Sequence, residues 1–419
     1  AGIVLGGAER SAAGLINAAD VDFSLFINDR FHFLNHFFDS GKRDFAFDKD
    51  LHVLYLNPSL SFSPGPHVRC FLEAEGQFTF DFKQDDADSD IDLRNAYIQA
   101  ALPSLHWINF SAGQQSLSTM EGLVYDDESP TLRIKADLER GFMSPFKIDA
   151  LVTKIKDSSP YAFIELKYCF SLLESLRVSY GWFRDSDDGV ARVFNYLAQD
   201  NLYASRGRVQ WMGFSATKFA GNALFKFNFI YEKGSARLRE KGAGTASVTT
   251  RGYLADISCE YSLTPQLSLA LFFYLASGDN NPQKGTFKSF ISIDPYIDKT
   301  NIFFNGGIDS QFSSDNVGLG GVQTAGVMTP GITVDYRIGD NMSLKYVFAY
   351  LFTHRRAAGE GTTYGWESDI TGYYTITRNI QIFAEVNALK PGNYFKKLTG
   401  YRDHMSSEIL IGINYLFNN

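Results

Sequence analysis

Apolar and polar residues alternate along nearly the whole chain. On one face of the last stretch, 408–417, lie Ile409, Ile411, Ile413, Tyr415 and Phe417. A period of two predicts β-strands with one apolar face. Strands of about ten residues, repeated this often, indicate a wall between lipid and water rather than an ordinary protein core.

The alternation predicts eighteen strands. They span 20–36, 50–62, 67–81, 91–102, 106–117, 131–140, 146–156, 160–171, 175–186, 205–218, 222–234, 249–263, 266–277, 325–337, 341–354, 365–377, 380–390 and 405–417. An even number of long strands with one apolar face is typical of bacterial membrane barrels. We therefore expect an all-β fold, a transmembrane antiparallel up-and-down β-barrel of 18 strands.

The connections between these strands alternate in length. Short turns such as 63–66, 103–105 and 264–265 are followed by connections that are mostly long and polar, such as 187–204 and 278–324. Outer-membrane barrels have short periplasmic turns and long external loops. A soluble sandwich or propeller has no reason to separate its loops in this way. This alternation of short and long connections predicts a protein of the outer membrane of a Gram-negative bacterium, with both termini in the periplasm.

The predicted organisation is simple. Residues 1–19 form a periplasmic N-terminal lead-in, and residues 20–419 form a single outer-membrane β-barrel with a long external loop at 278–324. That loop is too apolar for a disordered tail, which favours a constriction or lid folded into the barrel; the alternative is an external loop packed on its neighbours. Because the chain starts at Ala1 without a basic and apolar leader, we expect a mature secreted protein whose signal peptide has been removed.

Composition agrees with strands that are apolar on one side only. The chain has 37 Phe and 22 Tyr, and 45% of its residues are hydrophobic, yet the mean hydropathy is −0.15. The most apolar run, 267–276, is much shorter than the roughly 20 residues that a membrane helix needs. A net charge of −8 argues against nucleic acid as a partner. The three cysteines lie on separate predicted strands and suggest neither a metal site nor a disulfide framework.

Aromatic residues gather near the ends of the predicted strands, where their rings would sit among lipid headgroups. Trp107 fits the periplasmic end, and Trp182 and Trp366 fit the external end. We therefore expect outer-membrane lipid and lipopolysaccharide as partners.

Eighteen strands normally enclose a water-filled channel, so the inward-facing positions are the functional candidates. The predicted pore-lining residues are Glu73, Glu75, Tyr97, Gln99, Arg133, Lys135, Lys147, Lys167, Arg177, Arg206, Arg208, Lys226, Asp335, Arg337, Lys345, Glu367, Asp369, Glu385 and Glu408. Charges at alternate positions of membrane strands are tolerated where they face water. The sequence therefore predicts a polar lumen.

The predicted lumen charges are unevenly distributed. Strands six to eleven carry most of the bases, mixed with acids, whereas strands sixteen to eighteen and strand three carry mainly acids. In a closed barrel these would be opposing walls, and such an arrangement would set a transverse field that selects ions. The alternative is that the lumen charges pair across neighbouring strands.

Acidic clusters at 85–90, 126–128 and 185–188 fall in predicted external loops. Their oxygen-rich spacing suits calcium, but no glycine-turned loop accompanies them. A solvated acidic surface is the preferred interpretation, and we predict no metal site.

Catalysis has little support in the sequence. The seven histidines fall mostly near strand ends and turns, and no nucleophile elbow or zinc-binding spacing accompanies them. We predict no enzyme, no catalytic residues and no cofactor. An outer-membrane hydrolase with a Ser–His pair is the minor alternative.

Three short segments carry a resemblance to a known family. They are Leu93-Arg-Asn-Ala-Tyr-Ile-Gln99, Phe110-Ser-Ala-Gly-Gln-Gln115 and Ala276-Ser-Gly-Asp279. With the strand plan, these segments make the chain resemble the alginate-export family of outer-membrane porins. The resemblance implies an eighteen-stranded porin. It does not imply alginate as the solute, because Gln114 stands where the family usually has an arginine.

The main hypothesis is a porin that passes hydrophilic solutes, either oligosaccharides or small organic ions, by diffusion through a polar lumen. A second hypothesis is a barrel scaffold or sheath that anchors a protein partner or displays its external loops. Discrete conductance in a lipid bilayer would distinguish the first from the second.

Overall fold

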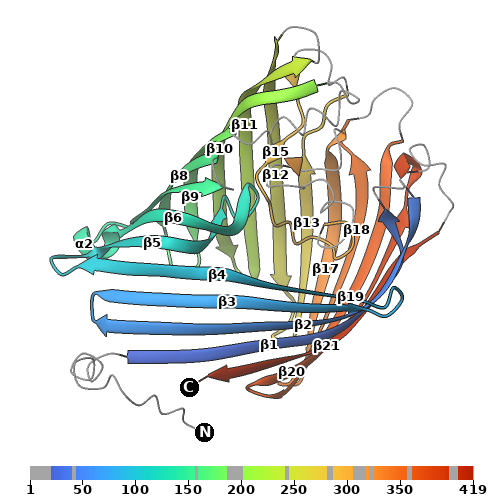
Figure 1. Cartoon of the computed structure of the whole chain (residues 1–419), viewed down its shortest axis with the longest axis horizontal. Helices are drawn as coiled ribbons and strands as arrows, with labels where there is room; N and C mark the ends of the chain where they lie inside the picture. Colours follow the sequence, from blue (N-terminus) through green and yellow to red (C-terminus); the bar gives the residue numbers. More distant parts are fainter. Residues whose placement is uncertain are drawn as a thin grey trace.

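The structure is a computed structural model in which one sheet closes into a barrel (Figure 1). It describes residues 20–39, 44–155, 159–185, 202–240, 245–280, 286–304, 318–319, 325–355, 361–395 and 404–418. The predicted lead-in, 1–19, lies outside the described residues. Among the described residues, no helix is both long enough and apolar enough to cross a membrane.

Eighteen long strands form the barrel wall. They are β1 (Asp20–Asp39), β2 (Asp44–Gly65), β3 (Val68–Asp81), β4 (Asp86–Leu102), β5 (Leu105–Thr119), β6 (Tyr125–Asp137), β7 (Phe146–Ile155), β8 (Ser159–Cys169), β9 (Ser175–Asp185), β10 (Leu202–Ala220), β11 (Ala223–Glu240), β12 (Thr245–Ser262), β13 (Leu267–Ala276), β17 (Val327–Ile338), β18 (Met342–Thr353), β19 (Thr363–Thr377), β20 (Ile380–Pro391) and β21 (Ser406–Asn418). Shorter elements are β14 (Thr286–Phe287), β15 (Ile291–Ser292), β16 (Gly318–Leu319) and the helix α2 (Leu138–Phe142).

Each wall strand pairs antiparallel with the next, and β13 pairs directly with β17. The first and last strands close the circle, from the pair Ser24–Asn418 to the pair Asn35–Ser407. The predicted fold, an antiparallel 18-stranded barrel, is thus confirmed. Closure matters because a barrel has no unpaired sheet edge.

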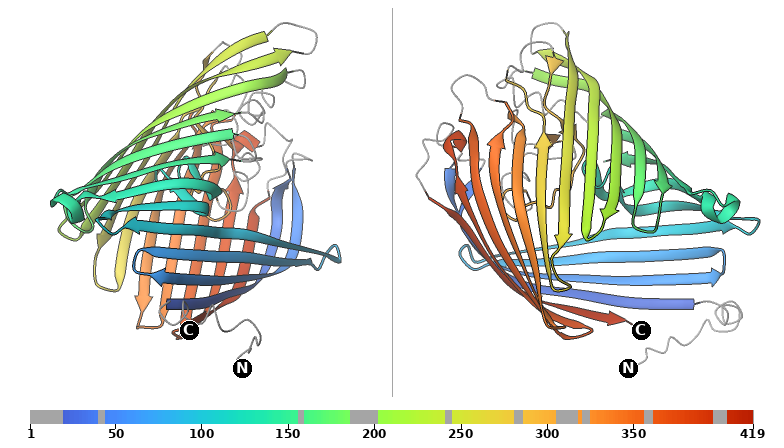
Figure 2. Two further views of the ribbon diagram at one scale, coloured as in Figure 1. Left: turned by 60° about the vertical axis from the view of Figure 1, so that its left-hand side comes forward. Right: turned by 180° about the vertical axis from the view of Figure 1, so that it is seen from behind.

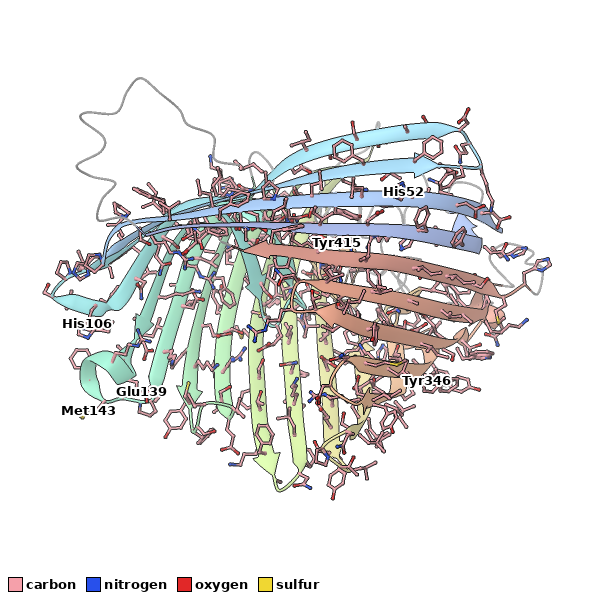
Figure 3. The ribbon with its side chains drawn as sticks, turned by 90° about the horizontal axis from the view of Figure 1, so that it is seen from below. His52, His106, Glu139, Met143, Tyr346 and Tyr415 are labelled. Carbon is pink, nitrogen blue, oxygen red and sulfur yellow. The ribbon has the colours of Figure 1, made fainter. Side chains whose placement is uncertain are left out.

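The two faces of the wall differ as the alternation predicts. On β13, Leu271 points outward and is 58% exposed, whereas Tyr274 points inward and is fully buried. Tyr346 projects from the outer face of β18 (Figure 3). The apolar residues that leave one side of each strand therefore form a continuous outer surface.

Both ends of the wall lie at the same end of the barrel. Asp20, the first residue of β1, pairs with Ser63, close to the short turn that joins β2 and β3. Asn418, near the end of β21, pairs with Ser24. Figure 2 shows the strands running from this end to the end that carries the longer connections.

Several strands are longer than predicted at the end with the longer connections. β2 begins at Asp44, β4 begins at Asp86 and β6 begins at Tyr125. The predicted loops 82–90 and 118–130 are accordingly reduced to the turns 82–85 and 120–124. The extensions of β4 and β6 carry no clear apolar alternation, and that of β2 has only Phe45 and Phe47 at alternate positions, although all three backbones pair.

Trp107 does not lie on the outer face, contrary to the prediction. It shares a face with the lumen residue Asn109, and its ring packs on Phe142 of α2 at 5.1 Å between centroids. Gly141 leaves room for this ring, because a Cβ atom there would collide with the indole. Figure 3 marks this corner of the barrel with His106, Glu139 and Met143.

The connection between β13 and β17 leaves and re-enters the wall through a narrow neck. A Cβ atom on Gly278 would collide with the carbonyl oxygen of Ala325. Gly326 has φ of +66°, and a Cβ atom there would come within 2.5 Å of the carbonyl oxygen of Ala276. Glycine is therefore required on both sides of the neck.

We predict that Gly278→Ala lowers the stability of the barrel by about 1–3 kcal/mol, because the added methyl group overpacks the neck. Gly65→Ala is the matched control, since nothing lies within 4 Å of its Cβ position. The thermal unfolding midpoint in detergent should fall for Gly278→Ala and stay close to wild type for Gly65→Ala. Equal midpoints would contradict the tight neck.

Candidate functional site

A segment of the long connection runs through the interior of the barrel, and we call its residues 286–304 the strap. It begins with β14, which pairs in parallel with β12 through Thr249–Thr286 and Thr250–Phe287. Figure 1 shows the strap inside the curved wall, around the label of β15. The strap reaches three parts of the wall in turn.

The first contact is with β10 and β11. The indole Nε1 of Trp211 donates to the carbonyl oxygen of Ile291 at 2.8 Å. The carboxylate of Glu232 accepts from the Ile291 amide at 3.4 Å and from the Thr250 hydroxyl. Trp211 and Glu232 are fully buried. At this point the strap also forms β15, which pairs with β16 through Ile291–Leu319 and Ser292–Gly318, and the buried side chains of Trp211 and Glu232 supply further hydrogen-bonding partners to its backbone.

The second contact is with the turn between β5 and β6. The amide of Ile293 donates to the carbonyl of Val124 at 2.7 Å, and the amide of Tyr296 donates to that of Gly122 at 3.0 Å. The turn itself is buried, including Leu123 and Val124. The sequence placed this segment in an external loop. Its apolar residues were the signal that it folds inward.

The third contact is with Glu367 of β19. One carboxylate oxygen accepts from the amide of Ile302 at 2.5 Å. The other accepts from the amide of Phe303 at 3.0 Å and from the hydroxyl of Thr300 at 2.7 Å. Glu367 is fully buried. A single carboxylate thus binds three donors of the strap, from Thr300, Ile302 and Phe303.

Asn301 binds the residues beside Glu367. The backbone amide of Asn301 donates to the carboxylate of Asp369 at 3.1 Å. Its side-chain amide donates to Glu385 at 3.1 Å and to Asn387 at 3.0 Å. The side chain of Asn387 in turn donates to Glu408 at 2.8 Å. These hydrogen bonds extend the contact from β19 across β20 to β21.

The strap therefore covers the wall that the sequence predicted to be an open acidic surface. Glu367 and Asp369 are almost completely buried beneath it. They act as hydrogen-bond acceptors for the strap rather than as one side of an exposed transverse field. Sequence alternation identified their face correctly but gave no sign of what covers it.

Apolar side chains fill the space between the strap and the wall. The ring of Phe304 packs on Tyr274 at 5.4 Å, and that of Phe303 packs on Tyr364 at 5.4 Å. Lys299 binds Asp256 at 2.7 Å. This buried cluster is a core inside the barrel, and it fixes the strap against β12, β13 and β19.

The opposite wall is open. Three hollows adjoin along the inner face from β2 to β8, with volumes of about 560, 340 and 340 Å³. Gln99 and Asn109 line the first and second hollows, and Asn109 and Lys135 line the second and third. Tyr97 and Gln115 add polar groups to the second. We call this series of hollows the open lane.

Ion pairs across neighbouring strands neutralise much of the charge along the open lane. Arg133 binds Asp149 at 2.5 Å and Lys147 binds Asp137 at 3.1 Å. Arg94 forms ion pairs with both Glu75 and Glu128, and Arg177 forms one with Glu121 of the turn 120–124. The alternative stated in the sequence analysis, in which lumen charges pair across neighbouring strands, therefore describes this wall. In the described part of the chain, Lys135 and Lys167 have no carboxylate within ion-pair distance.

Most of the predicted pore-lining residues lie on the inner face of the wall. These are Glu73, Glu75, Tyr97, Gln99, Arg133, Lys135, Lys147, Lys167, Arg177, Lys226, Asp335, Arg337, Lys345, Glu367, Asp369, Glu385 and Glu408. Each alternates along its strand with apolar residues of the outer face. The side chain of Arg206 lies outside the described residues.

Arg208 is the exception, and its predicted place was wrong. It lies on the outer face of β10 with Met212 and Phe214, whereas Val209 and Trp211 point inward. Arg208 donates to the exposed hydroxyl of Ser235 at 3.2 Å. Arg208 pairs with the residue before the last residue of β9. At this end of the strand, a charged side chain on the outer face reaches water. The rule that charges face the lumen therefore fails at this strand end.

Tyr296 is a residue that the sequence did not single out as a site. Its side chain is 56% exposed, the most exposed large apolar side chain of the strap. The hydrogen bond from its backbone amide to Gly122 of the turn 120–124 holds Tyr296 in the part of the strap between the covered wall and the open lane. Tyr296 is therefore a candidate for the edge of the constriction.

A hollow of about 810 Å³ is not part of this site. It lies on the outer face of β4–β9 and is lined by apolar residues such as Ala100, Phe110 and Leu132. Such a surface suits lipid chains rather than hydrophilic solutes. Within the described residues, no group of three or more His, Cys, Asp or Glu is placed to hold a metal ion.

Neither a protein-family model nor a curated protein matches this chain, so the resemblance to the alginate-export family stays a prediction. Solved structures are similar in fold. OpdL of Pseudomonas aeruginosa is 11% identical, with 95% of this chain and 99% of that chain covered and a TM-score of 0.58.

Two further structures from the same organism contain a bound solute. OccK2 (OpdF) in complex with glucuronate is 11% identical, with 95% and 98% covered and a TM-score of 0.56. The outer-membrane protein OpdK with vanillate is 11% identical, with 96% and 99% covered and a TM-score of 0.56. At this identity the likeness shows that the chain shares the barrel fold of these proteins.

We predict that Lys135→Glu shifts ion permeability toward cations, because the reversed charge faces the open lane. Arg208→Glu is the matched control, since the same reversal on the outer face leaves the lumen unchanged. Reversal potentials across a lipid bilayer under a salt gradient measure both variants. A shift with Arg208→Glu and none with Lys135→Glu would contradict the assignment of faces.

Proposed function

We propose that this protein is an outer-membrane channel through which small hydrophilic solutes diffuse without chemical change. The apolar outer surface would sit in the outer membrane of a Gram-negative bacterium, in contact with lipid and lipopolysaccharide. The short turns and both chain ends would face the periplasm, as in other bacterial barrels.

The observation that carries this proposal is the contrast between the two sides of the lumen. The strap fills the side formed by β10–β13 and β17–β20 with a packed core at the end with the longer connections, and a polar hollow of about 640 Å³ remains on this side beside the turn 263–266. The open lane follows the other side, with polar groups such as Tyr97, Gln99 and Asn109 on its surface. A lumen that is filled at one end of this side and is polar and hollow along the other side suits the passage of small solutes.

We infer that small organic anions are the preferred solutes. Lys135 and Lys167 both line the third hollow of the open lane. An ammonium group without a close carboxylate can bind the carboxylate of a passing solute. The glucuronate and vanillate in the two similar barrels are both carboxylates, which supports this solute class.

Purified protein in planar lipid bilayers tests the proposal. We expect discrete single-channel conductance in potassium chloride, because the open lane holds water and ions. A barrel that is folded but silent would contradict the channel and support the alternative of a scaffold or sheath for a partner.

We predict that Tyr296→Ala increases single-channel conductance, because the variant removes a large exposed ring from the strap and keeps the backbone amide that donates to Gly122. Tyr346→Ala is the control, since it removes the same ring from the outer face of β18. Conductance recorded in the same bilayer composition compares the two. Unchanged conductance for Tyr296→Ala would place the constriction elsewhere.

A further inference from the structure

We propose that the strap is an acid-released gate: proton uptake at its anchoring side chains frees residues 300–303 from the wall and widens the channel. This inference rests on the proposed channel function. It arises from the chemistry of two contacts: carboxylates accept hydrogen bonds from strap residues 300–303, and a histidine accepts one from Gly278 at the neck.

Glu367 is the central anchor. Both of its oxygens accept hydrogen bonds, and two of the three donors are backbone amides that have no other role to take. A protonated carboxyl carries a donor on one oxygen and loses acceptor capacity there. Protonation of Glu367 removes its negative charge and one acceptor lone pair, so the bonds from the amides of Ile302 and Phe303 are no longer charge-assisted. These anchoring bonds are therefore weakened in acid.

Asp369 and Glu385 hold Asn301 in the same way, through acceptor oxygens. The other charged and titratable groups around this cluster come from four elements. They are Arg30 and His32 of β1, Lys345 of β18, Glu408 of β21, and Asp298 and Lys299 of the strap. Carboxylates thus form most of the polar contact of residues 300–303 with β19 and β20, so this end of the strap is the part that protons can weaken.

His354 provides a second proton-sensitive contact, at the neck. Its Nδ1 accepts from the amide of Gly278 at 3.0 Å, and its Nε2 lies 3.0 Å from the hydroxyl of Tyr253. Burial and the adjacent Arg355 lower the pKa of His354. The neutral ring therefore persists below the ordinary histidine range, and the bond to Gly278 is lost as the pH falls through the lowered pKa.

Acid weakens both the carboxylate contacts of the strap and the His354 contact at the neck. Protonation takes an acceptor lone pair from Glu367, Asp369 and Glu385, and it also removes the acceptor at His354. Other bonds of the neck do not involve titrating side chains: the hydroxyl of Tyr364 donates to the carbonyl of Gly326 at 2.9 Å, and the amide of Arg355 donates to that of Ala325 at 2.8 Å. Residues 300–303 of the strap would therefore be released from β19 and β20, while residues 286–296 stay bound through the pairing with β12, the Trp211–Ile291 bond and the bonds to the turn 120–124.

Single-channel conductance at about pH 7 and about pH 4.5, a range that spans carboxylate titration, tests the gate. Wild type should show a larger conductance in acid. Glu367→Gln with Asp369→Asn should give the larger conductance at both pH values, because amides cannot replace two anionic acceptors. Asp335→Asn is the control, since it removes a lumen carboxylate that lies away from the strap and should keep the wild-type response.

A tethered strap separates movement from simple titration of lumen charge. Asn301→Cys and Asn387→Cys place thiols where two side chains now touch at 3.0 Å, and they leave Glu367 and Asp369 intact. The native Cys70, Cys169 and Cys259 are replaced by serine in this variant. Oxidation should abolish the conductance increase in acid, and reduction should restore it.

The possible results separate the two proposals. A barrel that conducts with no increase in acid, or whose increase survives the oxidised tether, overturns the gate and leaves the channel intact. A folded barrel that is silent at both pH values overturns the channel and the gate together. An increase in acid that the tether abolishes reversibly supports both.

Discussion

The structure depends on one constraint, which is that backbone amide and carbonyl groups in hydrocarbon must all be paired within the protein. The wall meets it by closing: β1 pairs with β2 on one side and with β21 on the other. Every strand then has two neighbours, and each side chain must point either to lipid or to the lumen. The alternation in the sequence follows directly from this requirement.

The same constraint explains the unusual interior. The strap is irregular backbone inside a barrel, and such backbone is tolerated only where protein or water satisfies its polar groups. Trp211, Glu232 and Glu367 supply hydrogen-bonding partners to the strap, in addition to the short pairing of β15 with β16. Charged side chains that would otherwise line a wide pore therefore hold a segment that narrows it. The open lane is the part of the lumen that this segment leaves uncovered.

The sequence predicted the wall well because each strand carries its own local signal. The existence of eighteen strands and the inner or outer side of most residues follow from a period of two. Arg208 shows the limit, because near a strand end both faces meet water and the period no longer distinguishes them. The polar start of β4 at Asp86 was missed for the same reason.

The site was harder to predict because it depends on contacts between segments far apart in the chain. Glu367 was placed on the correct face, but the amides that it binds lie about sixty positions away in a connection without periodicity. The inward fold of the turn 120–124 likewise depends on the strap that covers it. Apolar residues in the predicted loop 278–324 indicated burial, but they could not say where.

The central claim is that the strap narrows the channel without sealing it. Swelling of liposomes that contain the purified protein tests this claim directly. The account predicts rapid swelling in a small carboxylate such as glucuronate and none in a large, branched polysaccharide. No swelling in either solute would mean a sealed barrel, and swelling in both would mean that the strap does not restrict the lumen; either result would contradict the account.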